Sequence, residues 1–376
     1  MSEPTITQLL REDLRNQSAY GAPQLDVPIA LNTNESSYDV PETVVRSIVE
    51  RVEKAAGGLN RYPDREFTEL RAALADYLDR VTGVRLPVEQ IWAANGSNEV
   101  LSHIVQAFGG PGRVALGFTP SYSMHPIIAR GAGTTWVDGL RDRREGVYDL
   151  DVDLAVDQVR EHRPNVVFVC TPNNPTGTAV SNDVVRAIYD AAPNAVVIVD
   201  EAYVEFARPG TPSALELLAD HPRLIVSRTM SKAFAFAGAR VGYMAASREI
   251  CDAMRLVRLP YHLSSVTQAT ALAALDHAEE MLAMVDAIKA QRDRIVEAAR
   301  VAGLTPTPSD ANFVLIGGLT DAHATWQALL DRGILVRDVG IAHHLRITAG
   351  TPAETDAVIA ALTDLAPTHA LQEEKA

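Results

Sequence analysis

Short apolar runs separated by helical stretches dominate the chain from about residue 90 onward. The runs are rich in β-branched residues and nearly continuous, which is typical of strands buried on both faces of a mainly parallel α/β sheet. Binding sites in such sheets lie at the carboxyl ends of the strands. The predicted strands are Ile91–Ala94, Val114–Leu116, Val166–Val169, Val196–Val199, Leu224–Val226 and Val241–Met244.

Apolar residues at helical spacing predict an amphipathic helix over residues 65–81 and a long helical stretch over residues 272–299. At 376 residues the chain is longer than one hydrophobic core supports, so we expect more than one domain. We predict an N-terminal arm over residues 1–35 that joins a small domain, a large domain over residues 36–275, and a small α/β domain over residues 276–376. The predicted strands of the small domain are Asn312–Ile316, Ile334–Val336 and Leu345–Thr348.

The formal net charge of −14 at pH 7 disfavours nucleic acid and anionic membrane surfaces as partners. A small anionic substrate is compatible with this charge, because local arginines can override it. The polar N-terminus lacks the apolar core of a secretory signal and no apolar stretch approaches membrane-spanning length, so we expect a cytoplasmic protein. The two cysteines form no CxxC motif, and Cys170 lies in an apolar run that favours a core position.

The segment Arg228–Arg240 places one lysine, Lys232, among small and apolar residues after a predicted strand. Desolvation would lower the pKa of this lysine, and Schiff-base chemistry with an aldehyde requires a neutral amine. The side chains of Thr229, Ser231 and Arg240 could bind a phosphate beside that amine. These features favour pyridoxal 5'-phosphate (PLP) as a cofactor. For a lone lysine the commoner interpretation is a solvated surface residue, and a Ser–Lys dyad is disfavoured because adjacent side chains point apart.

Three further segments follow predicted strands and supply groups that suit the same cofactor. Asn95–Glu99 opens a helix whose free N–H groups could bind a phosphate, although an ordinary helix cap is an equally good interpretation. Asn174, in the turn Thr171–Gly177, could donate an amide hydrogen bond to a ring oxygen, although alone the segment is an ordinary turn. Asp200 could keep a pyridine nitrogen protonated while Tyr203 contacts the phenolic oxygen. A Walker-B metal site is disfavoured because the chain has no P-loop glycine motif.

These motifs in this order resemble the fold type I PLP-dependent aminotransferases, and the resemblance covers nearly the whole chain. Within that family the chain is most similar to the histidinol-phosphate aminotransferases. The motifs that carry the family resemblance are Asn174–Gly177, Asp200–Tyr203, Ser231–Phe234 and Arg240. Those that carry the closer resemblance are Arg61–Asp64, Ala93–Glu99, Pro120–Pro126, Leu335–Asp338 and Leu345–Thr348.

The resemblance implies a seven-stranded type of sheet in the large domain and ping-pong transfer of an amino group between L-histidinol phosphate and 2-oxoglutarate or L-glutamate, in histidine biosynthesis. Lys232 matches the lysine that holds the cofactor and moves the substrate proton, and Asp200 matches the partner of the pyridine nitrogen. Asn174 and Tyr203 match the groups on the phenolic oxygen, and Tyr122 matches the stacking residue. The residues that match the phosphate-binding set are Ser97, Asn98, Thr229, Ser231 and Arg240.

The resemblance also implies how substrate and a partner subunit are engaged. Arg346 matches the arginine that binds the substrate carboxylate, and in this subfamily it would also take the phosphate of histidinol phosphate. Arg337 and Tyr20 match other residues that bind that phosphate. Tyr62 matches a tyrosine that reaches the cofactor phosphate of the partner subunit, which implies a homodimer.

One departure from the subfamily concerns the substrate. After Asn32–Glu35 the subfamily usually has Asn-Pro, whereas this chain has Ser36 and Ser37, and aromatic aminotransferases often have a hydroxyl residue there. An aromatic amino acid aminotransferase is therefore the alternative function. Another PLP reaction is disfavoured by the subfamily motifs, and a PLP-binding regulator by the lack of a basic helix-turn-helix extension. We assign no histidine a catalytic role, and we expect no metal site because carboxylate or cysteine partners at ligand spacing are missing.

Overall fold

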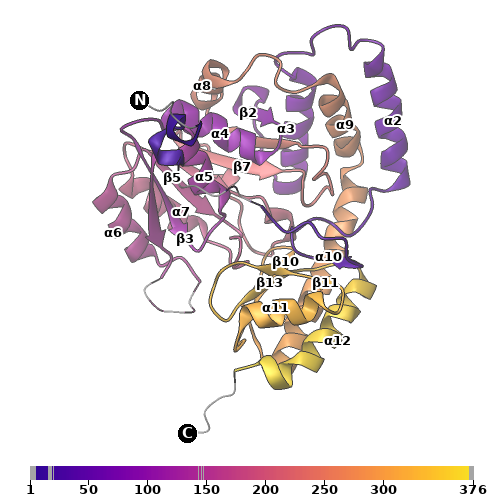
Figure 1. The fold of residues 1–376 in the computed structure, drawn as a ribbon. Coiled ribbons are helices and arrows are strands. Elements are labelled where there is room, and N and C mark those ends of the chain that lie inside the picture. The colour runs from indigo at the N-terminus through magenta and orange to yellow at the C-terminus, as the bar shows by residue number, and fades with distance from the viewer. Residues whose placement is uncertain are drawn as a thin grey trace.

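Figure 1 shows the computed structural model of the protein, which describes residues 6–15, 19, 21–142, 144, 146 and 148–371. Its largest sheet has seven strands: β2 (Ile91–Ala94), β3 (Val114–Thr119), β4 (Thr135–Leu140), β5 (Val166–Cys170), β6 (Val196–Asp200), β7 (Leu224–Thr229) and β8 (Gly242–Ala246). Their order is β2-β8-β7-β6-β5-β3-β4, and all neighbours pair in parallel except β8, which is antiparallel to β2 and β7. The mainly parallel α/β sheet predicted from the sequence is confirmed.

The sequence pattern missed one strand of this sheet. Every predicted apolar run of the large domain overlaps a strand, although Val241 lies just before β8, whereas β4 has no continuous apolar run. Strand β4 lies at the edge of the sheet, and most of its residues are partly or fully exposed, Thr135 and Asp138 among them. An edge strand has one neighbour and so does not need the buried faces that produce an apolar run.

Helices pack on this sheet and on one another. They are α2 (Glu42–Ala56), α3 (Thr68–Thr82), α4 (Ser97–Phe108), α5 (Met124–Gly131), α6 (Val152–His162), α7 (Asn182–Ala191), α8 (Arg248–Val257) and α9 (Ser265–Asp276). Helix α2 packs against α9, α3 against β2, α4 against β7 and β8, and α6 against α7. Shorter helical segments are α1 (Ile6–Leu9) and the 3-10 turns Glu12–Leu14, Val88–Gln90, Val204–Phe206 and Ala214–Leu217.

Two predicted helices differ in their ends. The helix expected over residues 65–81 begins at Thr68, because Phe67 has a left-handed backbone (φ 39°) and Asp64 accepts a hydrogen bond from the Thr68 N–H at 2.8 Å. The helix expected over residues 272–299 is wrong as a single element. It is interrupted at His277 (φ −113°, ψ 28°), where α9 ends and α10 (Ala278–Val301) begins.

Helix α10 leads into a second, smaller layer of structure (Figure 1). Its four-stranded antiparallel sheet has the order β12-β13-β10-β9. The strands are β9 (Thr305–Pro306), β10 (Phe313–Gly317), β12 (Arg337–Asp338) and β13 (Leu345–Thr348), and the helices are α11 (Ala322–Leu330) and α12 (Pro352–His369). Separately, β1 (Ile29–Ala30) pairs in parallel with β11 (Ile334–Leu335), so the N-terminal segment lies against this layer. The exact domain boundaries stay a prediction.

No helix in the described part of the chain is long and apolar enough to cross a membrane. Among the same residues, no group of three or more His, Cys, Asp or Glu side chains could hold a metal ion.

Candidate active site

The parallel register aligns the ends of three neighbouring strands. Cys170 on β5, Asp200 on β6 and Ser227 on β7 are paired across the sheet near its carboxyl edge. A cavity opens at this edge, and the residues that line it are Glu35, Ser97, Asn98, Tyr122, Cys170, Asp200, Ala202, Tyr203, Thr229, Ser231, Lys232, Ala237 and Arg240. Segments that are distant in the sequence therefore meet where the sequence analysis expected a cofactor site.

Lys232 is partly buried at this cavity. Its Nζ donates a hydrogen bond to the backbone carbonyl of Thr33 at 3.1 Å. Burial lowers the pKa of Lys232 to about 8, helped by the positive charges of Arg346 and Arg240 and opposed by Glu35. A lysine with this pKa is partly neutral near pH 8 and can attack an aldehyde.

Asp200 is buried and held by two side chains. Ser227 donates to Oδ1 at 2.9 Å, and His125 Nε2 lies 3.0 Å from Oδ2. The His125 ring also stacks on Phe168, with centroids 4.6 Å apart. The sequence analysis quoted His125 only as part of a motif and gave it no role. The signal that could have found it is its place just after Tyr122, on α5 above the carboxyl edge.

The N-terminus of α4 forms a narrow cradle with Arg240. Gly96 has φ 82°, and a Cβ at this position would lie 2.4 Å from Arg240 Nη2. A Cβ at Gly242 would lie 2.1 Å from the backbone nitrogen of Ser97. The two glycines thus let a guanidinium and a strand approach the helix end, where N–H groups and a positive charge favour an anion. This cradle fits a phosphate group.

Tyr203 closes another side of the cavity. Its hydroxyl accepts hydrogen bonds from Asn34 Nδ2 at 3.0 Å and from Asn174 Nδ2 at 3.4 Å. Burial raises the pKa of Tyr203 to about 12, against the lowering effect of Arg346. The phenol is therefore neutral at physiological pH and can donate a hydrogen bond to an oxygen anion. Asn34 is a second site residue that the sequence analysis missed, although it mentioned the surrounding motif.

Arg346 connects the small sheet to this network. It is buried on β13, where Nη1 donates to Asn174 Oδ1 and Nη2 donates to the carbonyl of Asn32, both at 2.6 Å. Arg337 lies directly opposite Arg346 in the β12–β13 register, so both side chains point to the same face of the sheet. Within the described part of the chain, Arg337 makes no side-chain hydrogen bond or ion pair. Two adjacent guanidinium groups on one face suit a dianionic ligand.

Some predicted site residues are not among the described residues that line this cavity, and these include Asn174, Arg337, Arg346 and Tyr62. Tyr62 is 79% exposed and stacks on Tyr261, with ring centroids 4.4 Å apart, and it is not among the described residues that line the cavity of its own chain. Tyr20 lies outside the described residues. The roles assigned to Tyr62 and Tyr20 from the sequence stay predictions.

The fold contains a seven-stranded sheet, and Lys232, Asp200 and Arg240 of the anion cradle line one cavity at its carboxyl edge. This combination is typical of one class of enzyme. The chain belongs to the class I and II aminotransferases, whose family model matches residues 26–362.

More specific relatives share one name. The histidinol-phosphate aminotransferase of Paenarthrobacter aurescens (strain TC1) is 62% identical over 358 residues, which cover 95% of this chain and 94% of that protein. That of Mycolicibacterium smegmatis is 55% identical over 361 residues, with 96% and 94% covered. The solved structure of histidinol-phosphate aminotransferase from Sinorhizobium meliloti in complex with PLP is 28% identical. It has a TM-score of 0.78, with 91% of this chain and 92% of that chain covered.

Proposed function

We propose that this chain is a PLP-dependent aminotransferase that moves an amino group between L-histidinol phosphate and 2-oxoglutarate or L-glutamate. The observation that carries the proposal is the cavity in which Lys232, Asp200 and the cradle formed by Gly96 and Arg240 face one space. The relatives of 51–62% identity that bear the name histidinol-phosphate aminotransferase support the substrate.

The residues of the cavity fit PLP at each of its polar groups. When bound, PLP would supply an electron sink that makes the Cα–H bond of the substrate acidic. Lys232 Nζ would hold the aldehyde carbon of PLP and later accept and return the Cα proton. Asp200, oriented by His125 and Ser227, would keep the pyridine nitrogen protonated. Asn174 and Tyr203 would hold the ring oxygen by hydrogen bonds.

The phosphate of PLP would lie in the cradle at the start of α4. There the N–H groups of the helix, the side chains of Ser97, Asn98, Thr229 and Ser231, and the Arg240 guanidinium would bind it. Tyr122 would stack on the ring, because it lines the cavity and its hydroxyl bonds Asn98 Oδ1 at 3.3 Å. Together these contacts would fix the ring between Lys232 and the substrate.

Two substrates that take turns at one site need an anion pocket that accepts both. Glutamate has an α-carboxylate at the position where histidinol phosphate has a phosphate ester. Arg346 would bind either anion, and Arg337, which faces the same side of the sheet, would add the second guanidinium that a phosphate requires. We include a homodimer in the proposal, with Tyr62 reaching the partner's cofactor phosphate, because Tyr62 is exposed and lies away from the cavity of its own chain.

A substrate panel tests this proposal. Purified, PLP-loaded protein is assayed with histidinol phosphate, phenylalanine and tyrosine as amino donors and 2-oxoglutarate as acceptor. We expect kcat/KM for histidinol phosphate to exceed that for the aromatic amino acids by at least about 100-fold, the worth of two charge-assisted hydrogen bonds. A preference for the aromatic amino acids would instead favour the alternative raised by Ser36 and Ser37.

A further inference from the structure

Two segments that carry stacked tyrosines lie side by side at the surface. Tyr62 precedes α3, Tyr261 follows α8, and their rings stack at an interplanar angle of 12°. The ring of Tyr62 is exposed, and Tyr62 is not among the described residues that line the cavity of its own chain. Its orientation therefore depends on what holds the two segments together.

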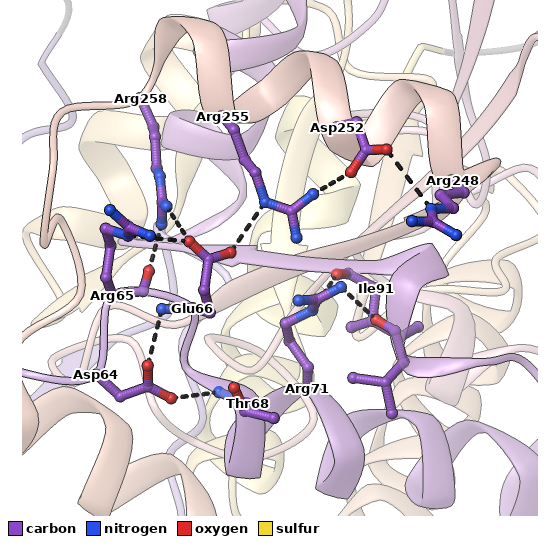
Figure 2. Close-up of polar contacts among 11 residues, drawn as sticks. Asp64, Arg65, Glu66, Thr68, Arg71, Ile91, Arg248, Asp252, Arg255 and Arg258 are labelled. Atoms are coloured by element: carbon purple, nitrogen blue, oxygen red, sulfur yellow. Dashed lines mark hydrogen bonds and ion pairs between the residues drawn. The ribbon is translucent and has the colours of Figure 1, made fainter.

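Glu66 joins these segments (Figure 2). Its Oε1 accepts a hydrogen bond from Arg258 Nη2 at 2.5 Å, and its Oε2 accepts one from Arg255 Nε at 2.9 Å. Arg258 also donates to the backbone carbonyl of Arg65. The Arg258 side chain is 5% exposed and that of Glu66 is 27% exposed, so this ion pair is partly shielded from solvent and lies between a surface pair and a buried pair in strength. We call Glu66, Arg255 and Arg258 the clamp.

The clamp lies close to both tyrosines in the chain. Glu66 follows Tyr62 by four residues, and Arg258 precedes Tyr261 by three. The next residue after Glu66, Phe67, is buried edge-on against Trp92 in a left-handed backbone conformation that only firm surroundings maintain. One ion-pair network thus fixes both halves of the tyrosine stack against the core.

Exposed leucines lie near both tyrosines in the chain. On the same two segments, Leu59 is 56% exposed, Leu256 is 85% exposed and Leu259 is 76% exposed. Exposed apolar residues of this kind favour a protein partner. We take the partner to be a second copy of this chain, because the role proposed for Tyr62 requires a partner subunit.

We propose that the clamp is a positioning device that holds Tyr62 in the orientation in which its hydroxyl reaches the cofactor phosphate of the partner subunit. The inference rests on the proposed function, because it requires the homodimer and the PLP site. The clamp residues are not among the described residues that line the cavity of their own chain. They act through Tyr62 by ordering it before PLP binds, so that the cost of ordering is not taken from binding.

The first test measures the dissociation constant for PLP together with the dimer fraction by sedimentation. Glu66→Gln should weaken PLP binding about ten-fold, as Tyr62→Phe should, because one charge-assisted hydrogen bond to the phosphate is lost or misplaced. Arg258→Lys keeps the charge but not the two-point contact, and should give a smaller loss in a folded dimer. The matched control is Glu42→Gln, in an exposed ion pair with Arg46, which should change the constant by less than about two-fold.

The double variant shows whether the clamp acts through Tyr62. In the Tyr62→Phe background, Glu66→Gln should add less than about two-fold, because the hydroxyl that the clamp positions is already gone. Independent, multiplying effects would contradict the proposal.

Hybrid dimers test whether the effect crosses the interface. A Glu66→Gln subunit paired with a Lys232→Ala subunit has one working site, which receives Tyr62 from the subunit with an intact clamp. It should bind PLP normally. Placing both changes in one chain and pairing it with wild type leaves a working site served by the broken clamp, and PLP binding there should be about ten-fold weaker. Equal affinities in the two hybrids, or the reverse order, would overturn the inference.

The clamp proposal and the role proposed for Tyr62 can be contradicted by different results. If Tyr62→Phe weakens PLP binding but Glu66→Gln does not, the clamp proposal alone is wrong. If Tyr62→Phe leaves PLP binding unchanged in an active dimer, the role proposed for Tyr62 is wrong and the clamp proposal falls with it.

Discussion

Two adjacent carboxylates at the end of β6 serve opposite purposes. Asp200 and Glu201 are both about 1% exposed, but successive side chains of a strand point to opposite faces of the sheet. Asp200 lines the cavity, and Glu201 is buried on the other side. The neighbouring strand repeats this division, since Ser227 contacts Asp200 and Arg228 contacts Glu201.

Glu201, the carboxylate on the side of the sheet away from the cavity, receives hydrogen bonds from several donors. Glu201 accepts hydrogen bonds from Arg228 Nη2 at 2.8 Å and Nε at 3.1 Å, from Ser213 Oγ at 2.8 Å and from the Ala214 N–H at 2.6 Å. Arg228 also lies 3.8 Å from Glu205. The opposite charges of Glu201 and Arg228 neutralise each other, and the Glu201 oxygens already accept hydrogen bonds from the protein, so Glu201 is not available to bind a ligand.

Asp200, the carboxylate that lines the cavity, has weaker hydrogen-bond partners. Asp200 is held by a hydroxyl and an imidazole, and it faces the cavity with acceptor capacity left over. The number and kind of partners therefore separate a structural carboxylate from one that can serve a cofactor. Burial alone does not separate them.

Exchanging each carboxylate for its amide should affect catalysis in one case and stability in the other. Asp200→Asn should lower kcat by at least about 100-fold, the usual cost of removing one preorganised electrostatic partner, with little change in thermal stability. Glu201→Gln should instead lower the free energy of unfolding by about 3 kcal/mol, because it takes from the buried Arg228 its nearest carboxylate and leaves only the longer contact with Glu205. Steady-state kinetics and denaturant unfolding measure the two effects. Similar losses of stability in both variants would contradict the division.

The small sheet offers a second contrast, between the buried Arg346 with its hydrogen-bond partners and the neighbouring Arg337, which has no side-chain partner among the described residues. Arg337→Ala should raise KM for histidinol phosphate about 10- to 100-fold and change KM for phenylalanine far less, because only the former carries a phosphate. The control is Arg332→Ala, which removes a guanidinium from an exposed pair with Asp364 and should leave both KM values unchanged. Equal effects of Arg337→Ala on both substrates would count against a phosphate role.

The smallest expected effect concerns the charge around Lys232. The rate of PLP capture by the cofactor-free protein should rise with pH through a midpoint of about 8 and then level off, since only the neutral amine reacts. Capture at pH 7 should be about ten-fold slower than at pH 9. Because the charge of Arg346 lowers this pKa, Arg346→Gln should move the midpoint to higher pH. Stopped-flow absorbance measures it, and an unmoved midpoint would contradict the electrostatic role of Arg346.

The lowered pKa of Lys232 also makes the free energy of unfolding depend on pH. The folded-state pKa of Lys232 is below its unfolded value of 10.5, so the charged form is disfavoured in the folded protein. The contribution of this residue to the free energy of unfolding therefore rises as the pH increases from about 8 to 10.5. Below pH 8 the full penalty applies, which is a stability cost of keeping a reactive amine.

The sequence was most informative where one run of residues carries both a strand and the polar group that follows it. Asp200 and Lys232 each follow a continuous apolar run, so their place at the carboxyl edge could be predicted. Strand β4 could not, because an edge strand has no such run.

Residues whose role depends on distant partners escaped prediction. His125 meets Asp200 across 75 positions, and Asn34 meets Tyr203 across 169 positions, so no local pattern connects either pair. Asp200 and Glu201 are adjacent in one motif, and the sequence alone did not distinguish their roles. Only the donors supplied by β7 and by the turn at Ser213 distinguish them.

The central claim is that Lys232 is the residue that binds the cofactor covalently. Loading the protein with PLP, reducing it with borohydride and mapping the peptides by mass spectrometry tests this claim directly, because reduction makes the lysine–PLP link permanent. We predict a phosphopyridoxyl group on Lys232, in the peptide that follows β7, and on no other lysine in stoichiometric amount. An unlabelled Lys232, or a stoichiometric label on a different lysine, would contradict the account.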